Sequence, residues 1–321
     1  MIRALFVFFA VVIAVSIAGG ARANESTLST PMIVGGGTPV GYYFGLAGSI
    51  CAAVNRTTDT GIRCLTVSND GSAQNIADVD SGKIDFAIVQ SDWLYHAANG
   101  TSRYRSTGAN DELRSVVAVP SEALTILARR SIGAKILTHL GGRRIGYGAP
   151  NNYAYLLMRA AVEAARISLS SENGEDGRAI DKICAGDIDV YVTVERHLNA
   201  GIAGLMSKCD LNLVALDRST IETVTSKRPD FAAYEIPSGS YAEAQPAIST
   251  FGLQAILIAQ SSAPDQKVTE VLGALFGPGS EGSQNHPPIR PPAAKHIEWL
   301  KEVAPLHRAA SDFYKNKGWA K

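Results

Sequence analysis

The 321-residue sequence has no excess of charge of either sign, with 30 Lys and Arg against 30 Asp and Glu. It gives no electrostatic reason to expect nucleic acid or an anionic membrane surface as a partner. It lacks a Gly-x-Ser-x-Gly hydrolase motif and a His-Glu-x-x-His pair, and its six histidines are scattered. We therefore expect no enzyme active site, no metal site and no cofactor.

Cysteine is scarce, and the four cysteines form no close Cys-x-x-Cys pair of the kind seen in zinc sites and redox dithiols. They lie in two groups that are far apart in the sequence. Of the three possible connectivities, we favour Cys51–Cys64 and Cys184–Cys209. Each would close a short loop and contribute about 2–4 kcal/mol to stability. Four free thiols are the less favoured alternative in an exported chain.

The N-terminus is typical of a secretory signal peptide. Arg3 is followed by fifteen uncharged, mostly apolar residues, 4–18, and then by Ala21-Arg22-Ala23, a small-x-small cleavage site. We expect residues 1–23 to be removed after Ala23, giving a periplasmic chain of 298 residues with a net charge of −2. Fifteen apolar residues fall short of the roughly 20 that a membrane-spanning helix needs, and no second apolar run reaches that length.

A glycine-rich stretch, 34–48, predicts a short strand, a tight loop and an amphipathic helix. It lacks the Gly-Lys-Ser/Thr ending of a phosphate loop, and Val40 stands where a dinucleotide motif has its third glycine. The loop can present backbone N–H groups at a positive helix end, which suits a carboxylate. The alternative is a turn that binds nothing. Tyr42 and Tyr43 fit the apolar helix face, yet either could direct its hydroxyl to a ligand, and Tyr43 is slightly favoured.

A short internal sequence repeat predicts two similar lobes. Ser81-Gly82-Lys83-Ile84-Asp85 precedes an apolar strand, and Ala185-Gly186-Asp187-Ile188-Asp189 does so again 104 residues later. The alternative is that the two segments match by chance or share only features that are common in α/β sequences. Because ligands bind at the carboxyl ends of strands in open α/β sheets, the residues after each strand become candidates. These are Gln90, Ser91 and Asp92 in one lobe and Glu195, Arg196 and His197 in the other. Asp85 and Asp189, at strand starts, are expected in turns or caps.

Several motifs in order resemble the TAXI family, the extracytoplasmic solute receptors of tripartite ATP-independent periplasmic (TRAP) transporters. They are the glycine loop with Tyr42-Tyr43, Asn69-Asp70-Gly71-Ser72, Ser81-Gly82 with Ile84-Asp85, Val89-Gln90-Ser91-Asp92, and Pro305-Leu306-His307 with Phe313-Tyr314. The resemblance implies a monomeric, two-lobe periplasmic binding protein of the second type, an α/β fold with mostly parallel sheets and an interlobe cleft. It also implies a small carboxylate or amino-acid ligand, TRAP-type permease subunits as partners, and no hydrolysis.

The resemblance places chain crossings near 120–130 and 243–253, so that lobe 1 comprises 24–125 and 248–321 and lobe 2 comprises 126–247. The sequence departs from the family at Pro150-Asn151-Asn152-Tyr153, at Arg196-His197-Leu198 and at His307-Arg308-Ala309. The first two departures fall at the expected ligand edge, so the ligand can differ from the family's commonest one.

We predict a receptor that closes around a glutamate-like amino acid or a dicarboxylate. Arg196 is the obvious cationic partner for a carboxylate. The candidate ligand residues are Thr38, Tyr42, Tyr43, Ser72, Gln90, Ser91, Asn151, Asn152, Glu195 and Arg196. One alternative is a ligand-sensing module for a membrane sensor kinase, which an adjacent kinase gene would favour over an adjacent permease gene. Another is an exported enzyme on the same scaffold, which turnover of a bound ligand would establish.

Overall fold

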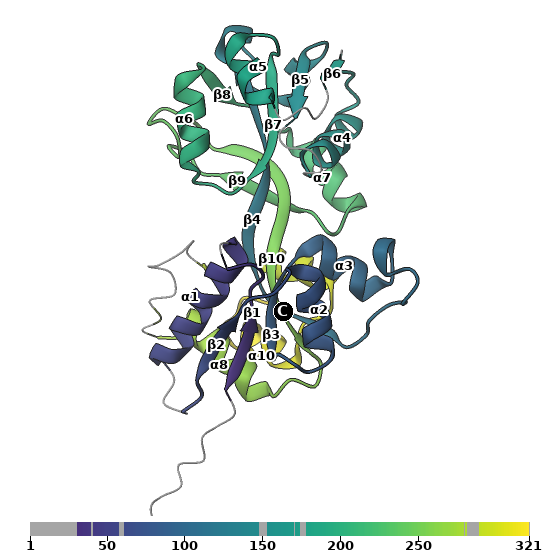
Figure 1. The fold of residues 1–321 in the computed structure, drawn as a ribbon, viewed down its shortest axis with the longest axis vertical. Coiled ribbons are helices and arrows are strands. Elements are labelled where there is room, and N and C mark those ends of the chain that lie inside the picture. The colour runs from purple at the N-terminus through teal and green to yellow at the C-terminus, as the bar shows by residue number, and fades with distance from the viewer. Residues whose placement is uncertain are drawn as a thin grey trace, which may run out of the picture.

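The computed structural model describes residues 31–39, 41–57, 61–147, 153–169, 171–173, 178–278, 280 and 289–320 (Figure 1). The expected signal peptide lies outside these residues. Within them, no helix is both long and apolar enough to cross a membrane. The elements form two groups at opposite ends of an elongated molecule, and two long strands run between the groups (Figure 1). We call these groups the first and second lobes.

The first lobe is a sheet flanked by helices on both faces (Figure 1). Its strands are β1 (Met32–Gly35), β2 (Cys64–Val67) and β3 (Phe86–Gln90), and β1 pairs in parallel with both of the others. Its helices are α1 (Tyr42–Thr57), α2 (Ser72–Asp80), α3 (Ser91–Asn99), α8 (Asp265–Phe276), α9 (Ala294–Val303) and α10 (Arg308–Asn316). Strand side chains alternate between two cores, one beneath α1, α8 and α10 and the other beneath α2, α3 and α9.

The second lobe repeats this arrangement. Strand β5 (Arg144–Tyr147) pairs in parallel with β6 (Ser171–Asn173) and β7 (Val190–Glu195). This lobe also contains α4 (Ala154–Ala165), α5 (Ala179–Ala185), α6 (Ala200–Lys208), α7 (Arg218–Lys227), β8 (Leu211–Leu213), β9 (Ala232–Ile236) and the short 3-10 turns Arg130–Ile132 and Leu137–Leu140. A further 3-10 turn, Ser102–Tyr104, follows α3 in the first lobe.

Strands β4 (Leu113–Arg129) and β10 (Ile248–Gln260) run antiparallel to each other and continue through both lobes (Figure 1). The strand order is β2-β1-β3-β10-β4-β7-β5-β6, with β8 and β9 pairing to β4 and β10. Each lobe therefore has three parallel strands followed by one antiparallel crossing strand. The apolar segments Val116–Val119 and Leu124–Ala128 belong to one strand, β4. Our lobe boundaries at 125/126 and 247/248 stay predictions.

The internal sequence repeat corresponds to a repeated structural feature, a carboxylate before a strand that binds the start of the neighbouring strand. Asp85 precedes β3, where its carboxylate accepts a hydrogen bond from Ile33 N at 2.8 Å at the start of β1. Asp189 precedes β7 and accepts from Arg144 N at 3.1 Å, at the start of β5. Both carboxylates thus fasten the start of one parallel strand to the start of its neighbour. They lie at the strand ends opposite the expected ligand edge, as predicted.

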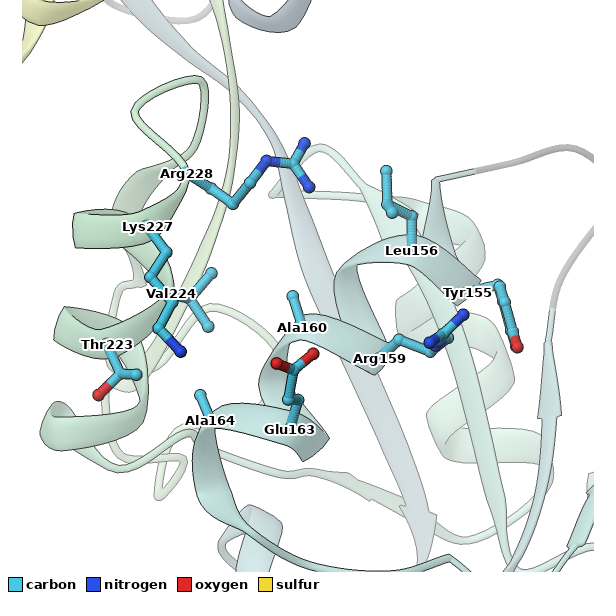
Figure 2. A pocket seen from close by; sticks show the side chains of 10 residues that line it. All are labelled: Tyr155, Leu156, Arg159, Ala160, Glu163, Ala164, Thr223, Val224, Lys227 and Arg228. Atoms are coloured by element: carbon cyan, nitrogen blue, oxygen red, sulfur yellow. The ribbon is translucent and has the colours of Figure 1, made fainter. Parts of the chain in front are cut away.

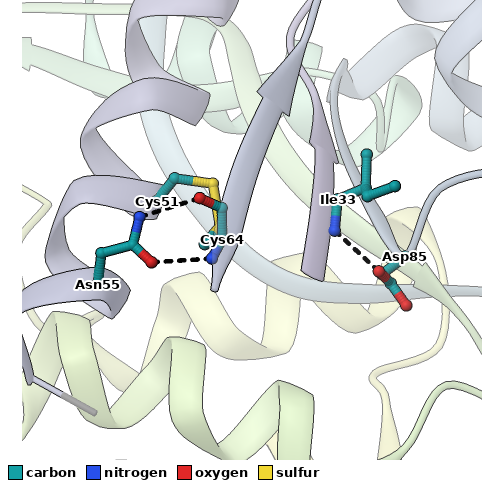
Figure 3. The surroundings of a disulfide bond; sticks show 5 residues. All are labelled: Ile33, Cys51, Asn55, Cys64 and Asp85. Carbon is teal, nitrogen blue, oxygen red and sulfur yellow. Dashed lines mark hydrogen bonds between the residues drawn. A yellow bond between two sulfur atoms is a disulfide. The ribbon is translucent and has the colours of Figure 1, made fainter. Parts of the chain in front are cut away.

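Both predicted disulfides are confirmed. Cys51 in α1 bonds to Cys64 at the start of β2, and Cys184 in α5 bonds to Cys209 just after α6. Beside the first bond, the side chain of Asn55 donates to Cys64 O at 2.9 Å and accepts from Cys64 N at 2.8 Å (Figure 3). The bond and the amide together hold the C-terminal half of α1 against the edge strand β2.

Two local features differ from what the residue types suggest. Ser91 and Asp92 are residue types that commonly cap helices, but α3 already begins at Ser91 and has no side-chain cap. Ser91 instead faces the interior, because its hydroxyl donates to Asp230 O at 2.7 Å and accepts from Gln254 N at 3.2 Å. The polar region 217–246, whose sequence suggests turns, contains α7 and β9. Few α7 side chains are buried, so its apolar stripe is too narrow to show in the sequence.

Candidate functional site

A cavity of about 270 Å³ lies at the carboxyl ends of the first lobe's parallel strands. The starts of α1 and α2 line it together with the end of β3 and one residue of the crossing strand β4. Its lining residues are Gly36, Gly37, Thr38, Gly41, Tyr42, Tyr43, Gly71, Ser72, Gln90 and Glu122. Five of the ten predicted ligand residues are therefore brought together here: Thr38, Tyr42, Tyr43, Ser72 and Gln90. Their role as ligand contacts stays a prediction.

Two glycines shape the rim of this cavity. A Cβ atom on Gly36 would lie 2.5 Å from Phe44 Cα, so the loop can pass this close to α1 only without a side chain. Gly37 has φ +85°, a conformation that residues other than glycine rarely adopt. Packing therefore requires glycine in this loop between β1 and α1, and the same loop suits a ligand. The resulting turn brings the starts of α1 and α2 to the same cavity, where helix dipoles favour negative charge.

Hydrogen bonds connect the polar groups on the cavity floor. The hydroxyl of Ser72 accepts from Gln90 N at 3.1 Å, which ties α2 to the end of β3. The side chain of Gln90 donates from Nε2 to Glu122 Oε2 at 2.7 Å. Burial raises the pKa of Glu122, while this hydrogen bond and the charge of Arg196 act in the opposite direction. The floor therefore carries a partly desolvated carboxyl group that no sequence motif indicated.

Arg196 reaches the cavity from the second lobe. It follows β7, and its guanidinium carbon lies 4.0 Å from the centre of the Tyr42 ring in α1. Burial raises the pKa of Tyr42 to about 12, and Arg196 partly offsets this. The Tyr42 hydroxyl is buried and has no hydrogen-bond partner among the described residues. This contact joins the two lobes at the mouth of the cavity and puts a cation there.

Hydrogen bonds hold the residues on both sides of Arg196, Glu195 and His197, in place. Glu195 accepts hydrogen bonds from Thr193 Oγ1 at 3.1 Å and from Asn199 Nδ2 at 2.8 Å. His197 contacts Thr125 Oγ1 in β4 at 2.9 Å and Tyr241 OH at 2.5 Å. These contacts fix the backbone on both sides of Arg196, and its exposed guanidinium remains directed at the first lobe.

Three other predicted residues have different outcomes. Ser91 is fully buried at the contact between the lobes and does not line the cavity. Asn151 and Asn152 lie outside the described residues, in the connection between β5 and α4. Glu122 was missed because we looked for ligand residues directly after strands, and Glu122 lies inside a long one. His197 was noted only as a residue after β7, and its bridging role depends on Tyr241, 44 residues later.

A second cavity, of about 370 Å³, lies on the second lobe between α4 and α7 (Figure 2). Arg159, Glu163, Lys227 and Arg228 line it among shorter apolar side chains. Arg228 is already paired with Asp230, at 2.6 Å. Within the described residues, none of the predicted ligand residues lines this cavity. Substitutions of its side chains are therefore suitable controls for the first cavity.

The first cavity is lined by groups that suit the binding of a small polar molecule. They are hydroxyls, an amide and one carboxyl, and Arg196 contacts the lining residue Tyr42. Within the described residues, no cluster of His, Cys, Asp and Glu could hold a metal ion. Such a mixture of backbone, hydroxyl and charged groups between two lobes suits reversible recognition.

Comparison with solved structures identifies the fold. The chain is similar to a TctC solute binding protein from Polaromonas, with a TM-score of 0.52, 13% identity and coverage of 92% of this chain and 91% of that chain. A second substrate-binding domain of a putative amino acid ABC transporter from Streptococcus pneumoniae gives a TM-score of 0.46 and 11% identity, covering 85% and 97%. The periplasmic VFT2 domain of Bordetella pertussis BvgS gives 0.38 and 12%, covering 78% and 89%.

The first of these similarities confirms the predicted fold class, a two-lobe periplasmic binding protein of the second type. The other two similarities have TM-scores below 0.5, and no conclusion about this protein follows from them. A sequence model of the NMT1-like family matches residues 34–318, which is most of the chain. The protein therefore belongs to the NMT1-like family.

Proposed function

We propose that the protein is an extracytoplasmic solute receptor of the TAXI type, which binds a small carboxylate and delivers it to a TRAP-type membrane permease. The ligand is a glutamate-like amino acid or a dicarboxylate. The observation that carries this proposal is the Arg196–Tyr42 contact, in which a cation from the second lobe meets a cavity of the first. A carboxylate in the cavity would contact both lobes and would stabilise their closed arrangement.

Three further observations support the proposal. The starts of α1 and α2 and the glycine turn favour negative charge in the cavity. Two disulfides suit an oxidising compartment outside the cytoplasm. Strands β4 and β10 provide two continuous connections about which the lobes can move. In this proposal the receptor binds reversibly and leaves the ligand chemically unchanged.

The first test is thermal unfolding of ligand-stripped, refolded protein against amino acids, dicarboxylates and keto acids. At a hundredfold excess over its dissociation constant, a true ligand adds about 2.7 kcal/mol of stability, a shift of several degrees. Arg196→Ala should abolish most of the shift. Arg159→Ala, which removes an arginine from the second cavity, should preserve it.

Either of two results would contradict the proposal: no shift with any compound in a demonstrably folded protein, or chemical turnover of the compound that binds. Loss of the shift in Arg159→Ala but not in Arg196→Ala would instead make the cavity between α4 and α7 the binding site. Circular dichroism of both variants checks that neither substitution unfolds the chain.

A further inference from the structure

Glu122 is an unusual residue for the floor of a carboxylate-binding cavity. It lies in β4 where this strand passes between the lobes, and its side chain is half-buried against the end of β3. Among the described residues, Glu122 accepts one hydrogen bond from a side chain, from Gln90 Nε2 to its Oε2. A carboxylate can accept about four hydrogen bonds, so Glu122 keeps capacity for donors from a ligand.

Groups of both charge signs lie at the cavity. The positive groups are Arg196, which stacks on the lining residue Tyr42, and the starts of α1 and α2, and the acidic group is the carboxyl of Glu122 beside Gln90. A molecule that carries one negative and one positive group at a short separation matches this distribution. A second carboxylate placed beside Glu122 would instead bring two like charges together in a partly desolvated site.

We propose that Glu122 selects the ligand by accepting hydrogen bonds from its ammonium group, while Arg196 and the helix starts hold its carboxylate. The inference rests on the proposed function and narrows it, since a free α-amino acid is then the ligand and a dicarboxylate or 2-oxo acid is not. Gln90 is a positioning residue in this arrangement, because its amide fixes the Glu122 carboxylate against β3.

The hydroxyls in the cavity fit the same arrangement. The Ser72 hydroxyl accepts from Gln90 N and therefore keeps its own hydrogen for an acceptor in the cavity. The hydroxyl of Tyr42 can donate in the same way, because it has no hydrogen-bond partner among the described residues. These hydroxyl donors suit the ligand's carboxylate, whereas Glu122 is the carboxylate acceptor that lines the cavity.

The test uses pairs of compounds that differ only in the ammonium group. L-glutamate with 2-oxoglutarate, L-alanine with pyruvate and L-leucine with 4-methyl-2-oxopentanoate are titrated calorimetrically into ligand-stripped protein, with succinate as the dicarboxylate. We expect the amino acid of at least one pair to bind at least about a hundredfold more tightly than its 2-oxo acid, because the analogue offers no ammonium group to the partly buried Glu122 carboxylate.

Glu122→Gln keeps the shape of the side chain but removes its charge. The substitution should weaken binding of the preferred amino acid at least about tenfold. It should also reduce the ratio between the affinities for this amino acid and for its 2-oxo acid. Glu163→Gln, which removes a carboxylate from the cavity between α4 and α7, should change neither quantity. Tight binding of a 2-oxo acid or succinate, undiminished in Glu122→Gln, would overturn the inference and leave the receptor function intact. Failure of every compound would overturn both.

The pH dependence of binding tests the inference without any variant. Since burial raises the pKa of Glu122 above its ordinary value, protonation of this carboxyl as the pH is lowered from 7.5 should weaken binding of the amino acid. Arg196, Asp92 and Glu195 also act on Glu122 electrostatically, and Tyr42 lies near it. The same titration in Glu122→Gln isolates the Glu122 contribution and should show a flatter profile. Affinity that rises as the pH falls would mean that a protonated Glu122 donates to a ligand carboxylate, which contradicts the inference.

Discussion

At the scale of single residues, His197 shows how one partly buried side chain positions the cation of the site. Thr125 Oγ1 donates to Ala123 O at 3.0 Å, so it accepts from His197 Nε2–H. His197 Nδ1 then accepts from Tyr241 OH, whose oxygen in turn accepts from Asn199 N at 3.1 Å. This chain of bonds assigns a neutral imidazole with its proton on Nε2. Burial agrees, because it lowers the pKa of His197 to about 4.

The neutral state of His197 should make stability depend on pH. Its pKa is about 4 in the folded chain and about 6.5 when unfolded, so the unfolded chain binds the extra proton between these values. The histidine's contribution is complete above pH 6.5 and is lost as the pH falls towards 4. We expect roughly 2 kcal/mol from this group, allowing for its partial exposure.

Urea unfolding of the protein and of His197→Asn at pH 7 and pH 4.5 measures this contribution. The difference in unfolding free energy between the two proteins should shrink as the pH falls. His139→Asn, at an exposed position, should leave the pH dependence unchanged. An equal difference between wild type and His197→Asn at both pH values would contradict the neutral, buried state of His197.

Residue identities could be predicted where a local pattern marks a strand end. Thr38, Tyr42 and Tyr43 follow β1, and Gln90 ends β3, so glycine turns and apolar runs place them at the cavity. Glu122 could not be found in this way. Its position depends on where β4 leaves one lobe and enters the other, and the break in the apolar pattern at 120–123 does not show which side chain there reaches the cavity.

At the scale of the elements, the closest approach of the two crossing strands depends on a glycine. Gly252 in β10 is paired with Ala123 in β4, next to Glu122. A Cβ atom on Gly252 would lie 2.0 Å from Glu122 O and 2.7 Å from Ala123 Cα. Backbone atoms cannot move aside as a flexible side chain can, so the two strands must separate to accept any side chain here.

Gly252→Ala should therefore cost about 3 kcal/mol or more of unfolding free energy, measured in urea. It should also displace Glu122 and weaken ligand binding. Gly273→Ala is the matched control, because Gly273 lies in α8 with no atom within 4 Å of a new Cβ. That control should be neutral or stabilising by up to about 1 kcal/mol, since alanine favours helix. Equal stability of the two variants would contradict the requirement for glycine at 252.

The sequence predicted most elements because their signals are local. Glycine turns, apolar runs of four to six residues and the repeated Gly-x-Ile-Asp motif locate β1, β3 and β7. The two similar lobes followed from that repeat. Helix α7 was missed because Thr220, Ile221 and Val224 are its only buried residues, and its exposed serines and threonines resemble a loop. The length of β4 was also missed, since 120–123 interrupts its apolar pattern at the crossing.

At the scale of the whole molecule, the lobes are joined by more than β4 and β10. On the side of α3, Ser91 donates to Asp230 O, and Trp299 Nε1 donates to Pro229 O at 2.8 Å. Tyr153, just before α4, donates to Asp92 Oδ2 at 2.6 Å. These contacts and the Arg196–Tyr42 contact involve different elements, so the lobes meet at two separate places along the crossing strands.

The hydrogen bond between Tyr153 and Asp92 supports a buried carboxylate at this contact. Asp92 is 3% exposed, and burial raises its pKa, which Tyr153 and Arg103 partly counteract. Arg103 lies 3.4 Å from Asp92, farther away than the phenol. Tyr153→Phe should therefore lower the unfolding free energy by about 1.5–3 kcal/mol, the usual range for a hydrogen bond to a charged group.

Differential scanning calorimetry tests how much this hydrogen bond contributes to stability and whether the two lobes still unfold together without it. Tyr155→Phe is the control, because Tyr155 lies two residues later in α4 and its ring contacts are with Tyr147 and Arg159. We expect Tyr153→Phe to lower the Tm by several degrees more than Tyr155→Phe. Both variants should keep one transition, since two shared strands make each lobe depend on the other for its sheet. A second transition in Tyr153→Phe alone would show that the Asp92 contact, rather than β4 and β10, makes unfolding of the two lobes cooperative.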